Sequence, residues 1–123
     1  MRALGLAACC VLAAVPALAA DVIEVRMVDD KFEPAQIVLE HGKPYRLHLV
    51  NAGKEMHEFA AKAFFDGAQV KDAATVLQYD GKEVLLQPGQ SRDVDFTAPA
   101  PGSYELTCPD HDWDNMVGKI VVK

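Results

Sequence analysis

Residues 101–123 have the sequence PGSYELTCPDHDWDNMVGKIVVK. Two runs in this stretch, Tyr104–Cys108 and Val117–Val122, carry the aromatic and β-branched residues that favour β-strands. A Pro/Gly turn at Ala98–Gly102 precedes the first run, and a polar loop joins the two runs. The stretch therefore predicts two strands with a loop between them.

The loop between these strands carries donor atoms for a soft metal. Cys108, His111 and Met116 stand in the spacing Cys-x2-His-x4-Met. A thiolate, an imidazole and a thioether in one loop suit copper cycling between Cu(I) and Cu(II). Two His and one Cys with a distant Met form the arrangement used for one-electron transfer, and His57 can supply the second imidazole.

The rest of the chain continues the strand pattern. Lys62–Tyr79 is the exception, and we expect it to be a loop with one or two helical turns. About eight short strands separated by Gly/Pro turns predict an all-β sandwich or barrel with Greek-key connections. The six further runs with this pattern are Val22–Met27, Gln36–Glu40, Tyr45–Asn51, His57–Ala61, Glu83–Gln87 and Ser91–Thr97.

The first nineteen residues have the pattern of an export signal. Arg2 is followed by the apolar run Ala3–Val15 and by the small residues Ala17–Ala19. We expect cleavage after residue 19, which leaves one copper-binding domain over residues 20–123. The apolar run is shorter than the roughly 20 residues that span a bilayer. A lipoprotein signal ending at Cys9 is the alternative, although few apolar residues precede that cysteine.

Cleavage would leave Cys108 as the only cysteine, so no intramolecular disulfide could form. A lone thiol in an oxidising compartment is either a buried structural residue or held by a metal, and His111 nearby favours the metal. The net charge is −6, which disfavours nucleic acid and anionic lipid and leaves a basic protein as a plausible partner.

Other chemistries fit these residues less well. Zinc accepts two His and one Cys but gains nothing from a methionine. A cysteine nucleophile would need an oxyanion site and an orienting partner, and Pro109 removes one backbone donor. Met116 could instead belong to the core, in which case another axial contact would serve the metal. We expect no enzyme activity, because multi-copper catalysis needs further His clusters.

Two stretches of this sequence resemble the cupredoxin family. PGSYELTCPDH followed by MVGKIVV is similar to the signature of plastocyanins and pseudoazurins. Phe32–Pro34, Val50–Gly53 and Met56–Phe59 resemble the small bacterial periplasmic cupredoxins. The resemblance implies a Greek-key β-sandwich of seven or eight strands that moves single electrons. It also implies three equatorial ligands, His57, Cys108 and His111, and a weak axial ligand, Met116.

The sequence departs from the family pattern at two places. The residue after the first His is usually Asn, which ties the two ligand segments together; here Glu58 takes that position, opposite Pro109, which has no N–H. By strand alternation we expect Glu58 to be exposed. The ligand loop also carries Trp113, as a lid, a docking surface or an ordinary aromatic, and three acids that should favour Cu(II): Asp110, Asp112 and Asp114.

Together these features predict an exported, monomeric, periplasmic type 1 copper protein. We expect it to carry single electrons between redox partners, one of them a basic protein such as a cytochrome. The alternative is a periplasmic protein that binds copper for tolerance or delivery with the same pocket.

Overall fold

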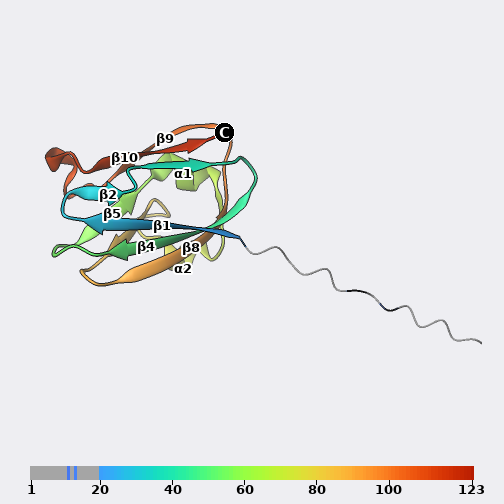
Figure 1. Cartoon of the computed structure of the whole chain (residues 1–123), viewed down its shortest axis with the longest axis horizontal. Helices are drawn as coiled ribbons and strands as arrows, with labels where there is room; N and C mark the ends of the chain where they lie inside the picture. Colours follow the sequence, from blue (N-terminus) through green and yellow to red (C-terminus); the bar gives the residue numbers. More distant parts are fainter. Residues whose placement is uncertain (1–10, 12, 14–19) are drawn as a thin grey trace, which may run out of the picture.

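The computed structural model describes residues 11, 13 and 20–123, and Figure 1 shows them as two packed sheets. The predicted signal peptide, residues 1–19, lies outside the described residues except for residues 11 and 13. Within the described part of the chain, no helix has the length and apolar character needed to cross a membrane.

The first sheet has the strand order β2-β1-β4-β8-β6. Its central strands β1 and β4 are parallel, with Val25 opposite Leu49, and its other pairs are antiparallel. Every second side chain of β4 points into the core, as the alternation in the sequence predicts. The bounds are β1 Asp21–Val28, β2 Lys31–Glu33, β4 Pro44–Asn51, β6 Gln69–Val70 and β8 Ser91–Thr97.

The second sheet has the order β3-β10-β9-β5-β7 and carries the candidate site. Strands β3 and β10 are parallel, and the other pairs are antiparallel. The chain crosses repeatedly between the sheets, and this confirms the predicted all-β sandwich. The bounds are β3 Gln36–Leu39, β5 His57–Ala60, β7 Glu83–Leu86, β9 Gly102–Thr107 and β10 Val117–Val122.

All eight expected strands are present, and two very short ones join them. β2 folds back on β1 and buries Phe32 against the aromatic ring of Phe59. β6 lies within the segment predicted to be a loop and pairs with the end of β8. Both were missed because two or three residues carry too little periodicity to predict a strand.

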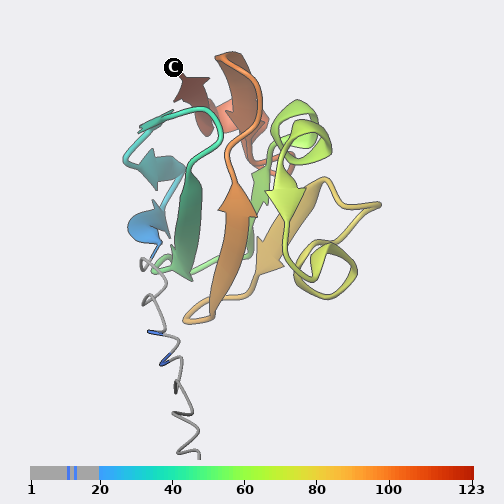
Figure 2. The same ribbon diagram turned by 90° about the vertical axis from the view of Figure 1, so that its right-hand side faces the viewer.

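The helical turns expected in Lys62–Tyr79 are also present, as α1 (Lys62–Gly67) and α2 (Ala73–Val76). The insertion lies along one side of the sandwich, in yellow-green in Figure 2. Phe64 and Phe65 of α1 are buried, and the Phe64 ring lies edge-on to Phe96 at 5.3 Å. The insertion therefore extends the core; burying one such ring stabilises the fold by about 1.5–3 kcal/mol.

Candidate metal centre

The sheet brings two distant segments together at one end of the sandwich. His57 opens β5, and Cys108 directly follows β9. Because β5 and β9 are antiparallel, with Ala60 opposite Thr107, the start of β5 lies beside the residues that follow β9. The rigid second sheet therefore fixes the distance between an imidazole and a thiol that are 51 positions apart.

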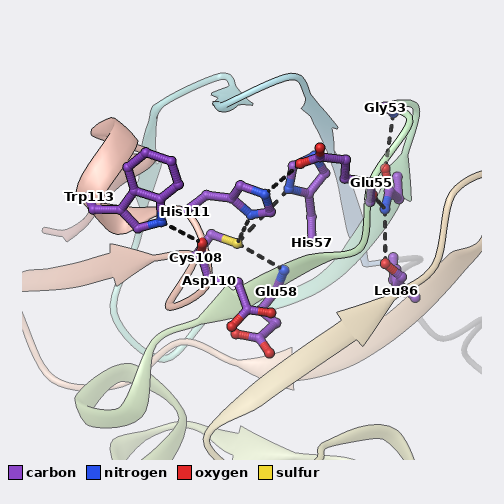
Figure 3. Close-up of polar contacts among 10 residues, drawn as sticks. Gly53, Glu55, His57, Glu58, Leu86, Cys108, Asp110, His111 and Trp113 are labelled. Carbon is purple, nitrogen blue, oxygen red and sulfur yellow. Dashed lines mark hydrogen bonds and ion pairs between the residues drawn. The ribbon is translucent and has the colours of Figure 1, made fainter.

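Three donor atoms converge at this end, as Figure 3 shows. The Cys108 sulfur lies 3.4 Å from Nδ1 of His111 and 4.0 Å from Nδ1 of His57. The ligand atoms of the three residues lie within 4.8 Å of one another. Both imidazoles therefore present the same nitrogen to the sulfur, as donors around one small cation would.

The backbone of the ligand loop is closed by its own hydrogen bonds. The Cys108 N–H donates to the carbonyl of Met116, and the Met116 N–H donates to the carbonyl of His111. A 3₁₀ turn at Asp112–Asp114 lies between them, and Asn115 ends it with a left-handed backbone (φ 65°). Met116 is fully buried. The three donors of the loop thus belong to one compact unit.

The pocket favours uncharged side chains when no metal is bound. Burial, followed by the nearby His111, lowers the pKa of His57. Burial raises the pKa of the Cys108 thiol, although the Glu58 N–H donates to its sulfur at 3.3 Å. A bound soft cation would instead lower the pKa of the Cys108 thiol, because a coordinated thiol loses its proton. Two imidazoles, a thiol and a buried thioether fit copper better than a hard cation.

Comparison with known families agrees with this geometry. The family described as "Cupredoxin-like domain" matches residues 2–122. The chain belongs to this family. This confirms the resemblance seen in the sequence. In this chain His57, Cys108, His111 and Met116 are positioned as a type 1 copper site for one copper ion.

Solved structures share the fold of this cupredoxin. Auracyanin B is 24% identical with a TM-score of 0.64, over 89% of this chain and 93% of that one. Dithionite-reduced auracyanin from Roseiflexus castenholzii is 21% identical with a TM-score of 0.64, over 85% and 98%. Auracyanin A of Chloroflexus aurantiacus, titled a "blue" copper protein, is 19% identical with a TM-score of 0.61, over 85% and 100%.

Glu58 is not exposed as predicted from strand alternation; only 6% of it is accessible. β5 is an inner strand of its sheet, between β9 and β7, and alternation alone does not report how closely neighbouring residues pack around its outward face. Burial, then the charges of Glu83 and Asp110, raises the pKa of Glu58 to about 7.

The end of β4 and the loop that leads from it to β5 each contain a residue whose part in the site the sequence did not reveal. Asn51 is fully buried and organises this loop through its side-chain amide. Glu55 follows in the loop, and its carboxylate lies 2.8 Å from Nε2 of His111. The available sequence signal for Asn51 was an asparagine two residues before Gly53, a pattern typical of an Asx turn. No signal links Glu55 to a residue so far along the chain.

Trp113 lies beside the site but does not cover it. Its side chain is 77% exposed, and its indole N–H donates to the carbonyl of Asp110 at 3.0 Å. The hydrogen bond fixes the ring on the surface next to His111. His41 and His48 lie elsewhere: each bonds to a neighbour outside the site, Pro99 and Asp93.

Proposed function

We propose that this cupredoxin carries single electrons between redox partners. In this proposal Nδ1 of His57, Nδ1 of His111 and the Cys108 sulfur would hold one copper ion, with the Met116 thioether as a fourth, weaker ligand. Bound copper would take up and release one electron between Cu(II) and Cu(I). The observation that carries the proposal is the convergence of both Nδ1 atoms on one thiol.

The scaffold suits electron transfer because it limits movement of the donors. His57 opens β5 and Cys108 directly follows the adjoining strand β9, and Cys108 and Met116 are joined through their backbones. A site that moves little between its oxidation states exchanges electrons with little reorganisation. Auracyanin A, which shares the fold, is named a "blue" copper protein, and this supports copper as the metal here.

We further propose export to the periplasm, with a signal peptide over residues 1–19 and a monomeric domain over residues 20–123. The partner would be a redox protein with a basic surface, such as a cytochrome. Its docking surface would include exposed Trp113 and Val117, with acidic residues around them. Acidic residues at the edge of this docking surface would raise the rate of association with a basic partner. Added salt would weaken this effect.

Absorption and EPR spectra of the copper-loaded protein test the site. We expect an intense thiolate-to-copper absorption band, which Cys108→Ser should abolish. A fully loaded wild-type protein without this band would overturn the proposal. Self-exchange and electron transfer to a basic cytochrome then test the role: a band with slow exchange would point instead to copper tolerance or delivery.

A further inference from the structure

Glu55 connects the two segments that bring the donors together. Its Oε2 lies 2.8 Å from Nε2 of His111, across 56 positions of the chain. The His111 side chain is 13% exposed and that of Glu55 is 71% exposed. The carboxylate therefore covers the outward edge of the imidazole, on the side away from Cys108 (Figure 3).

The position of Glu55 is set by the fully buried Asn51, because its amide holds the loop from both sides. Its Nδ2 donates to the carbonyl of Glu55 at 2.8 Å and to that of Leu86 at 2.9 Å. Its Oδ1 accepts from the Gly53 N–H at 3.0 Å. The backbone that carries the Glu55 side chain is thus fastened to the end of β7.

A carboxylate at this place selects one form of the imidazole. An ionised carboxylate only accepts hydrogen bonds, so Nε2 of His111 must donate. In a neutral ring Nδ1 is then left with its lone pair, and Nδ1 is the atom that lies 3.4 Å from the Cys108 sulfur. The contact therefore orients the ring and leaves the donor atom free for a metal.

We propose that Glu55 is a positioning residue for His111. In the family, an Asn after the first His usually ties the two ligand segments together, and Glu58 and Pro109 cannot form that tie. The hydrogen bond between Glu55 and His111 connects the two segments instead. The other imidazole offers a comparison within the same site. Nε2 of His57 is buried and has no hydrogen-bond partner in the described part of the chain, and a Cβ on Gly53 would lie 3.0 Å from it. Packing holds His57, whereas a hydrogen bond holds His111.

Two variants separate the hydrogen bond from the charge. Glu55→Gln keeps an acceptor oxygen but removes the charge, and Glu55→Ala removes both. Glu24→Gln is the control, because Glu24 is an exposed acid on β1 in the other sheet. The first measurement is ¹H–¹⁵N imidazole NMR of the metal-free protein with its thiol kept reduced. It does not depend on the proposed electron-carrier function.

In the wild type and Glu55→Gln we expect His111 to carry its proton on Nε2. In Glu55→Ala we expect that proton to exchange with water at least tenfold faster, with both tautomers populated. His57 should stay unchanged in all variants. Equal exchange of the His111 proton in the wild type and Glu55→Ala would overturn the proposal.

The second measurement rests on the proposed function and uses the copper-loaded protein. Loss of the negative charge in either Glu55 variant should shift the one-electron equilibrium toward Cu(I) three- to tenfold, which is about 30–60 mV in potential. Glu24→Gln should leave the potential unchanged. A potential that moves equally in the Glu24 and Glu55 variants would refute a specific role. If the wild type shows no thiolate-to-copper band, the function fails, and the metal-free spectra still decide the positioning role.

Discussion

Replacing Glu58 by Gln should stabilise the metal-free protein, and only above mildly acidic pH. Glu58 is 6% exposed, and its pKa is raised to about 7 by burial and by the charges of Glu83 and Asp110. An acid with a raised pKa in the folded state is held more favourably when neutral. The neutral Glu58 carboxyl therefore makes its full stabilising contribution to the free energy of unfolding below pH 4.5. This contribution is lost as the pH rises to about 7.

The size of the effect follows from the two pKa values. The rise from 4.5 to about 7 corresponds to at most about 3–4 kcal/mol of unfolding free energy. Water that reaches the charged carboxylate reduces this penalty, so we expect Glu58→Gln to gain about 1–3 kcal/mol at pH 8. At pH 4.5 the variant and the wild type should be equally stable, because both side chains are then neutral.

Urea unfolding at several pH values measures the difference, with the thiol kept reduced and copper absent. The midpoint of Glu58→Gln should exceed that of the wild type at pH 8 by on the order of 1 M. The lowered pKa of His57 has the opposite effect, a loss of stability as the pH falls below 6.5, but it is common to both proteins and cancels. Glu24→Gln controls for the change in net charge. An equal gain for Glu58→Gln at pH 4.5 and pH 8 would refute the reasoning.

Three further changes test other parts of the site. Asn51→Ala should lower the free energy of unfolding by about 2–4 kcal/mol, because it removes the three hydrogen bonds of a fully buried side chain; urea unfolding measures this. Gly53→Ala should displace His57, because a Cβ would lie 3.0 Å from its Nε2, and we expect an altered copper spectrum with less change in stability. Neutralising the acids of the ligand loop should raise the reduction potential, and voltammetry that finds no rise would contradict their role: Asp110→Asn, Asp112→Asn and Asp114→Asn.

Features that depend on local pattern could be predicted from the sequence. The alternation of Leu47 and Leu49 with polar residues placed β4 correctly, because a strand with one buried face repeats every two residues. The spacing of Cys108, His111 and Met116 pointed to a metal loop because donors so close in sequence stay close in any fold. The family match then agreed with the copper interpretation.

Features that depend on packing between distant segments could not be predicted. Alternation shows which face of β5 carries Glu58, but not that Glu58 is buried on that face in an inner strand of the sheet. The contact between Glu55 and His111 joins positions 56 apart, and nothing in the residues around either one indicates the other. Such contacts follow from the arrangement of strands, which a single sequence specifies only indirectly.

The distribution of the donors along the chain determines how copper uptake relates to folding. Three of them lie within residues 108–116, so an unfolded chain already holds them close together. His57 joins them only when β5 pairs with β9. An unfolded chain thus offers copper a flexible three-donor loop, and folding adds a fixed fourth group. Because metal bound by the unfolded chain offsets metal bound by the folded one, copper should stabilise this protein by less than its affinity for the folded state implies.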